Sequence, residues 1–193
     1  MEAIKKIEPK ITFEEYLALE QDNDGRHEFY DGKLIPIEAT TKAHNRIKRN
    51  LIRQIETPAF DKSSCELFDE NVLTQLTEKK KYVYPDIVIS CDPNDNDPLI
   101  VKSPTIIIEI LSPSTKKYDK TVKFFAYQRI PTLQQCIFVA QDTIEVKSFQ
   151  RSKDNQWILT TLESLADKLQ IPSLNLVIKL EDIYSNINII EAE

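Results

Sequence analysis

The sequence predicts one domain of the mixed α/β (α+β) class, with helices flanking a central mixed β-sheet. A length of 193 residues suits one domain with a sizeable core. Residues 82–90 and 105–111 are apolar runs of strand length. Two stretches with helical features, residues 41–57 and 116–129, lie before and after these strands. We therefore expect helices and strands to share one core.

The N-terminal part predicts a short helix followed by a β-hairpin. Thr12 lies where an N-cap is expected, and acidic residues occupy the first turn of a helix over about residues 12–20. Asp31-Gly32 separates two runs that contain apolar residues. Asp-Gly is typical of a type I′ hairpin turn, because both central residues of that turn need a positive φ.

The second predicted helix has one apolar face and one basic face. Thr40 or Thr41 is expected to cap it, and Pro58 to end it. The apolar stripe consists of Ile47, Leu51 and Ile55. The basic face consists of Arg46, Arg49 and Arg53. Such a face is a candidate for contacts with backbone phosphates of a nucleic acid.

The remaining segments complete the predicted order of elements. We expect a strand within 66–76, a buried strand over 82–90, an acidic loop over 92–98, a central strand over 105–111 and a helix over 116–129. Further strands are expected at 135–140, 145–150, 157–162 and 174–178. The predicted domain covers residues 1–184, and residues 185–193 form a C-terminal tail.

Composition limits the cell compartment and the partners. No apolar run approaches the roughly 18 residues that a membrane span needs, and the first residues lack the features of a signal peptide, so we expect a cytoplasmic protein without membrane contact. Cys65, Cys91 and Cys136 are widely spaced, which favours reduced thiols over a zinc site. The net charge of −6 argues weakly against nucleic acid as a partner but does not exclude it, because charge distribution matters more than the sum.

Two acidic residues in apolar strands are the most informative feature of the sequence. Glu109 lies within the central Ile-rich strand, and Asp86 lies in the buried strand before it, just after Pro85. An ionised carboxylate in such surroundings costs several kcal/mol unless it is paired or bound to a metal. If the strands are neighbours, both carboxylates can serve one Mg²⁺, which prefers oxygen ligands. A buried salt bridge at each acid is the alternative.

Five motifs in order carry a resemblance to a known family. They are Arg26-x-Glu28-x-x-Asp31-Gly32, His44, Pro85-Asp86, Glu109-Ile110-Leu111-Ser112-Pro113-Ser114-Thr115 and Asp119-x-x-x-Lys123-x-x-x-Tyr127. Together with a weaker echo near residues 171–174, they cover roughly residues 12–184. The set resembles a bacterial family of small restriction endonucleases within the PD-(D/E)xK nuclease superfamily, whose members have the restriction-endonuclease-like fold.

The resemblance implies a metal-dependent endonuclease that hydrolyses phosphodiester bonds, with DNA as the expected substrate. Asp86, Glu109 and the Ile110 carbonyl are then the expected ligands of Mg²⁺, for which Mn²⁺ can substitute. Position 111 holds leucine where the superfamily has a lysine, and the resemblance places that lysine at Lys123 on the following helix. A second departure, Gln135-Cys136 in place of an aromatic pair, is expected to affect packing only.

Several site assignments leave an alternative open. The resemblance makes Glu28 a further acidic group near the metal, but a hairpin salt bridge with Arg26 or Lys33 explains it equally well. His44 is either a proton carrier or a core or cap residue. Lys123 is either catalytic or half of a surface pair with Asp119.

The sequence also leaves the overall activity and assembly open. Lys116 and Lys117 are expected to be solvated or to face phosphate. Nucleases of this fold often dimerise, so the resemblance allows a homodimer. The alternatives to an endonuclease are a catalytically silent module that binds nucleic acid or oligomerises, and a scaffold with buried salt bridges.

Overall fold

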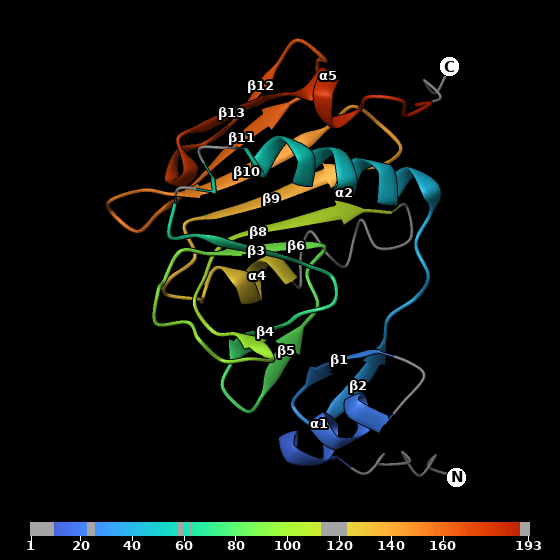
Figure 1. The fold of residues 1–193 in the computed structure, drawn as a ribbon, viewed down its shortest axis with the longest axis vertical. Helices are drawn as coiled ribbons and strands as arrows, with labels where there is room; N and C mark the ends of the chain where they lie inside the picture. Colours follow the sequence, from blue (N-terminus) through green and yellow to red (C-terminus); the bar gives the residue numbers. More distant parts are fainter. Residues whose placement is uncertain (1–9, 23–25, 58–59, 62, 113–122, 190–193) are drawn as a thin grey trace, which may run out of the picture.

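The computed structural model describes residues 10–22, 26–57, 60–61, 63–112 and 123–189 (Figure 1). It confirms the mixed α+β class. The largest sheet has six strands in the order β11-β10-β9-β8-β6-β3, of which only β8 and β9 run parallel. Its strands are β3 (Glu66–Asp69), β6 (Ile87–Ser90), β8 (Pro104–Leu111), β9 (Gln135–Ala140), β10 (Val146–Arg151) and β11 (Trp157–Leu162).

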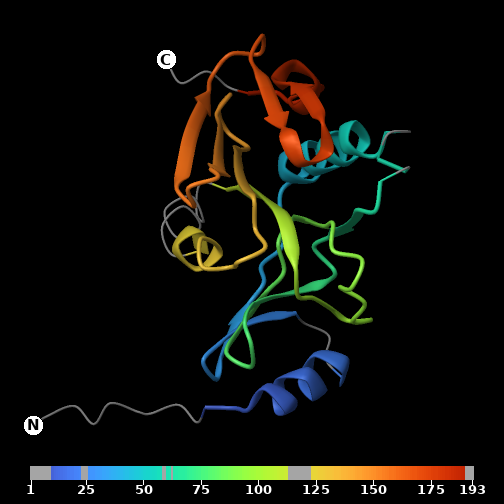
Figure 2. The same cartoon turned by 90° about the vertical axis from the view of Figure 1, so that its left-hand side faces the viewer.

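One face of the six-stranded sheet is covered by helix α2 (Lys42–Ile55), by the short helix α5 (Leu180–Ile183) and by a small hairpin (Figures 1 and 2). The hairpin consists of β12 (Lys168–Ile171) and β13 (Leu176–Lys179), which flank a 3₁₀ turn at Pro172–Leu174. The apolar stripe of α2 packs there on the alternate residues Ile106, Ile108 and Ile110 of β8. The predicted stripe is therefore the buried face of the helix.

The opposite face of the sheet packs against α4 (Phe124–Tyr127). Ile107 and Leu111 of β8 lie on this side, together with Phe124 and Tyr127. Because strand residues alternate between faces, Glu109 shares the α4 side with Ile107 and Leu111. From Ile106 to Leu111 the central strand is thus apolar on both faces, apart from this glutamate.

The N-terminal elements form a second layer around a five-stranded sheet of order β2-β1-β5-β4-β7. Its strands are β1 (His27–Tyr30), β2 (Lys33–Pro36), β4 (Leu73–Thr77), β5 (Lys81–Val83) and β7 (Ile100–Val101). Helix α1 (Phe13–Asp22) packs on it through a cluster of aromatic rings, in which Tyr16 stacks on Phe29. The predicted helix and hairpin are confirmed.

Two strands expected to be continuous are each divided between the two sheets. The predicted strand within 66–76 is β3 and β4, and the predicted strand over 82–90 is β5 and β6. In the second case the break falls at Tyr84–Asp86, where Pro85 cannot donate a ladder hydrogen bond. Both sheets consequently meet beside Asp86.

The C-terminal part differs from the expectation in smaller ways. The strand expected over 174–178 is β13, which begins two residues later than expected, at Leu176, because Leu174 ends the 3₁₀ turn. Strand β12 and helix α5 were not predicted. Ile187 and Ile189, within the expected tail, are half-buried against the core. Of the helix predicted over 116–129, residues 116–122 lie outside the described part, and the described portion ends at Tyr127.

The cysteines correct one expectation. Cys65 and Cys91 form a disulfide, whereas the sequence favoured reduced thiols. They directly extend the antiparallel pair Glu66↔Ser90 between β3 and β6, which brings residues 26 positions apart into direct opposition. Cys136 is a buried free thiol, as expected. No helix in the described ranges has the length and apolar character needed to cross a bilayer.

Candidate active site

Asp86 lies at the start of β6, where its side chain continues the pairing with β8. The last paired residues are Ile87 and Ile108. Beyond them, the Ile110 N–H donates to Asp86 Oδ2 at 2.7 Å. The Asp86 carboxylate thus accepts the Ile110 N–H of β8, which lies beyond the last residue pair of β6 and β8. This contact fixes Asp86 against the residue that follows Glu109.

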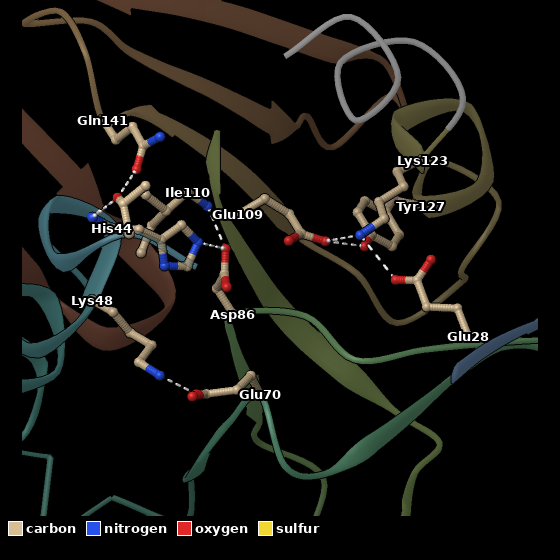
Figure 3. Close-up of polar contacts among 11 residues, drawn as sticks. Glu28, His44, Lys48, Glu70, Asp86, Glu109, Ile110, Lys123, Tyr127 and Gln141 are labelled. Carbon is tan, nitrogen blue, oxygen red and sulfur yellow. Dashed lines mark hydrogen bonds and ion pairs between the residues drawn. The ribbon is translucent and has the colours of Figure 1, made fainter. Parts of the chain in front are cut away.

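His44 approaches the same carboxylate from α2. Its Nε2 lies 3.1 Å from Asp86 Oδ2, and the ring is almost fully buried (Figure 3). Nδ1 is buried and has no hydrogen-bond partner among the described residues. A buried N–H without an acceptor costs more than a lone pair without a donor. We therefore assign the proton to Nε2, which makes His44 the donor and Asp86 the acceptor.

The helix start explains why His44 is held so firmly. Thr41 is the N-cap, and its Oγ1 accepts the His44 N–H at 3.1 Å. The same hydroxyl donates to Gln141 Oε1 at 2.6 Å, which ties the cap to the end of β9. His44 thus takes part in the helix cap and contacts Asp86, which fits the core or cap alternative, and its role as a proton carrier stays a prediction.

Glu109 belongs to a second set of contacts, on the α4 side of the sheet. Lys123 Nζ lies 3.4 Å from Glu109 Oε1 and 2.9 Å from Glu28 Oε1. The Tyr127 hydroxyl donates to the same Glu109 oxygen. All four side chains are almost fully buried. Burial, followed by the charge of Glu109, raises the pKa of Tyr127 well above its usual value, so the hydroxyl stays protonated and remains a donor.

This arrangement bears on two of the open alternatives, while the catalytic roles of Glu28 and Lys123 stay predictions. Glu28 points away from the contact that His27 makes with Glu20, as strand alternation requires, and it pairs with Lys123 rather than with Arg26 or Lys33. Lys123 is a buried residue at the centre of an acidic cluster, not half of a solvated surface pair. Asp119, its expected partner, lies outside the described residues.

A half-buried ion pair, which sequence reasoning missed, lies one helical turn beyond His44. Lys48 of α2 pairs with Glu70, just after β3 (Figure 3). Lys48 is only 5% exposed. Its position four residues after His44 and three before Leu51 places it on the inward side of the helix, which a helical wheel of the sequence reveals.

The two contact sets bear differently on the predicted metal ligands. Asp86 is held by His44 and Ile110, whereas Glu109 is held by Lys123 and Tyr127 (Figure 3). No group of three Asp, Glu, His or Cys side chains within the described ranges is placed to hold one ion. The expected set of two carboxylates and a carbonyl therefore stays a prediction.

The donor chemistry at Asp86 nevertheless fits a hard divalent cation. Among the described contacts, both hydrogen bonds of Asp86 end on Oδ2, so Oδ1 remains for another ligand. The side chain keeps 14% exposure, which allows access from solvent. Carboxylate oxygens at such positions are the usual ligands of Mg²⁺.

The structure describes some of the residues predicted to contact nucleic acid. Arg46, Arg49 and Arg53 are all exposed on α2, on the side opposite its buried stripe. Lys116 and Lys117 lie outside the described residues. The basic face is thus available for phosphate contacts, and its role stays a prediction.

Comparisons with known proteins place the chain in a family. Residues 13–181 match the family model described as "Uma2: Putative restriction endonuclease". Two Synechocystis proteins (strain ATCC 27184 / PCC 6803 / Kazusa) are similar over most of their length. Uncharacterized protein slr1290 is 29% identical over 177 residues, covering 91% of this chain and 92% of its own. Uncharacterized protein sll1609 is 36% identical over 155 residues, covering 79% and 87%.

A solved structure supports the fold independently. The crystal structure of a putative nuclease belonging to DUF820 from Anabaena variabilis ATCC 29413 superposes with a TM-score of 0.71 at 20% identity. It covers 91% of this chain and 98% of that one. This likeness confirms the predicted restriction-endonuclease-like fold. Since the family model spans nearly all of α1 to α5, the chain belongs to the Uma2 family, the group that the family description calls putative restriction endonucleases.

Proposed function

We propose that this protein is a metal-dependent endonuclease that hydrolyses phosphodiester bonds of DNA. One observation supports the proposal most. Lys123 pairs with Glu109 in a buried cluster. The Asp86 carboxylate accepts a hydrogen bond from the N–H of Ile110, the residue that follows Glu109 in β8. In this proposal the two acids and the lysine of the nuclease site come from three separate segments of the chain, and these contacts support it.

The residues of the chain have distinct proposed roles. Asp86 and Glu109, with the Ile110 carbonyl, would hold the Mg²⁺ or Mn²⁺ ion. When bound, such an ion supplies polarisation of the scissile phosphate and a lowered pKa of a bound water. His44 orients Asp86 through its Nε2–H. Tyr127 and Lys123 fix the Glu109 carboxylate, and the Lys123 ammonium offsets negative charge that develops on the phosphate.

Substrate and location remain part of this proposal. Exposed Arg46, Arg49 and Arg53 suit backbone phosphates, which position a duplex without reading its sequence. DNA is the proposed substrate because the family description names restriction endonucleases. We retain the cytoplasm as the expected location, although the Cys65–Cys91 disulfide favours a more oxidising environment.

The test is nicking of supercoiled plasmid with Mg²⁺ or Mn²⁺ by the full chain. The wild type is expected to nick only with the ion. Asp86→Asn and Glu109→Gln are expected to reduce nicking to the level without protein, because each removes a negatively charged ligand. Glu66→Gln, the same type of change at an exposed residue of the same sheet, should leave nicking unchanged.

Two outcomes would contradict the endonuclease proposal. One is a folded wild type that cuts neither plasmid, single-stranded DNA nor RNA with either ion. If that protein still binds DNA, the silent binding module replaces the enzyme. The other is nicking that survives in both Asp86→Asn and Glu109→Gln, which would point to a contaminating nuclease.

A further inference from the structure

Strand β11 is an unprotected edge of the six-stranded sheet. It ends the strand order and pairs only with β10. Its six residues, Trp-Ile-Leu-Thr-Thr-Leu, include no charge, proline or glycine. Ile158 is 56% exposed and Leu159 is 48% exposed, although they lie on opposite faces of the strand. An uncharged edge with exposed apolar side chains readily pairs with another strand.

The other edge strands of the described sheets have residues or lengths that normally prevent such pairing. Strand β2 has Lys33 and Pro36, β3 has Glu66 and Asp69, β12 has Lys168, β13 has Lys179, and β7 has only two residues. Charge, proline and shortness each block edge-to-edge association. Among the edge strands of the described residues, β11 is the exception.

The outer backbone of β11 has no partner within the described ranges. Every second residue of an antiparallel edge strand points its N–H and C=O away from its neighbour. No hydrogen bond from another described element reaches residues 157–162 on that side. In Figure 2, β10 and β11 (orange) form one margin of the sheet. The margin is therefore a row of donors and acceptors flanked by apolar side chains.

We propose that β11 pairs with β11 of a second copy of this chain, antiparallel and about a two-fold axis. Paired residues must lie on the same face, so their numbers must have the same parity. Of the registers that satisfy this condition, two pair the most residues of β11, five from each copy. With the axis at Leu159, Ile158 faces Thr160 of the other copy. With the axis at Thr160, Ile158 faces Leu162 instead. Neither register opposes like charges, because the strand has none.

A second copy fits better than an unrelated strand because the pairing is self-complementary and closes. Both copies use the same edge, so the two open edges satisfy each other in a twelve-stranded sheet (six strands from each copy). The two outer edges of this twelve-stranded sheet are the acidic β3 strands. The Cys65–Cys91 disulfide links the chain just before β3 to the chain just after β6. The assembly therefore stops at two copies instead of forming fibres.

The first test measures the solution mass of the full chain over a range of micromolar concentrations, by light scattering. The wild type is expected at twice the chain mass of 22.4 kDa. Ile158→Lys should shift the mass to that of one chain. Val177→Lys is the matched control, because Val177 on β13 is also 56% exposed, and it should stay dimeric. Circular dichroism and thermal melting confirm that each variant is folded.

The second test identifies the register and does not depend on a destabilising lysine. Leu159→Cys and Thr160→Cys each place a thiol on one of the two candidate axes. One of them is expected to form a cross-linked dimer on mild oxidation, visible on a non-reducing gel. A cysteine at Val177 should not cross-link.

Three results would overturn the proposal. They are a monomeric wild type at all concentrations, a folded Ile158→Lys variant that remains dimeric, and no cross-link in either cysteine variant. None of them depends on nuclease activity. Conversely, loss of nicking in Asp86→Asn leaves the mass measurement unaffected, so the two proposals fail separately.

Discussion

At the scale of single residues, the Lys123 ammonium lies between two buried carboxylates, Glu28 and Glu109. Taking charges out of water is costly, and their mutual attraction offsets that cost only while the set is complete. The hydrogen bond from Tyr127 adds a fixed donor to one of the acids. The cluster is therefore sensitive to the loss of its lysine.

We predict that Lys123→Met lowers the free energy of unfolding by roughly 3–5 kcal/mol, because it leaves buried carboxylates without their cation. The double variant Lys123→Met/Glu28→Gln should lose less than the single one, since one of the stranded charges is gone. Urea denaturation of the four members of this mutant cycle measures the coupling.

A surface pair supplies the control for this cycle. Lys147 lies 3.1 Å from Glu145 with 28% exposure, and Lys147→Met should cost at most about 1 kcal/mol. Equal losses at Lys123 and Lys147 would show that the buried cluster contributes no more than an ordinary surface contact.

At the residue level, the sequence draws attention to a charge that sits in an apolar pattern, and the role of Glu109 as a metal ligand stays a prediction. Glu109 interrupts an isoleucine run, and this anomaly alone marks it as a partnered acid. Lys48 escaped attention because its helix also carries many exposed basic residues. The partners of these side chains come from distant positions, such as Glu28 for Lys123, and no local pattern encodes that choice.

At the scale of elements, the β1–β2 hairpin has a turn whose backbone conformation is determined by its own two residues. Asp31 and Gly32 both adopt positive φ, at 49° and 88°, as the Asp-Gly pair predicts. The turn also packs closely on the chain before α1, because the Ile11 N–H donates to the Gly32 carbonyl at 3.1 Å. Since this hairpin carries Glu28, its geometry determines whether that acid reaches Lys123.

We predict that Gly32→Ala destabilises the protein by more than about 1 kcal/mol, because φ is positive there. The added Cβ would also lie 2.8 Å from the Lys10 Cβ. Asp31→Asn is the control, since asparagine tolerates this backbone conformation, and it should be nearly neutral. Thermal melting of both variants checks this, and a Gly32→Ala variant as stable as the wild type would be inconsistent with it.

Element boundaries were harder to predict than element types. Strands β5 and β6 follow each other in one apolar run, so periodicity alone joins them. They separate because each pairs in a different sheet, β5 with β1 and β4, and β6 with β8 and β3. Pairing partners are set by the tertiary structure, which the run itself does not contain.

At the scale of the whole molecule, exposed acids that accept backbone N–H groups make stability depend on pH. A hydrogen bond from the Thr12 N–H lowers the pKa of Glu15. The Lys102 side chain, followed by the Leu99 N–H, lowers the pKa of Asp97. The Ser164 and Glu163 N–H groups lower the pKa of Asp167. A depressed pKa in the folded state means that this stabilisation is present above the unfolded value and is lost as pH falls through the folded one.

We therefore predict that the urea midpoint is stable near neutral pH and falls once the pH drops below the ordinary values of 4.5 for Glu and 3.8 for Asp. Asp167→Asn should reduce the part of this fall that lies below pH 3.8, because its amide oxygen still accepts hydrogen bonds but does not titrate. An unchanged midpoint at pH 3 would argue against the linkage.

The sequence by itself determined the class of fold, the Asp-Gly turn, a helix cap at Thr40 or Thr41 and the two acids in apolar strands, because each follows from the periodicity of nearby residues or from a charge that is costly to leave unpaired in an apolar strand. Only the tertiary structure decided that the apolar runs split between two sheets, that Cys65 meets Cys91, and that Lys123 lies between Glu28 and Glu109. These contacts join residues far apart in the chain, and their geometry depends on how the sheets pack. For that reason local patterns identified the acids, and packing selected their partners.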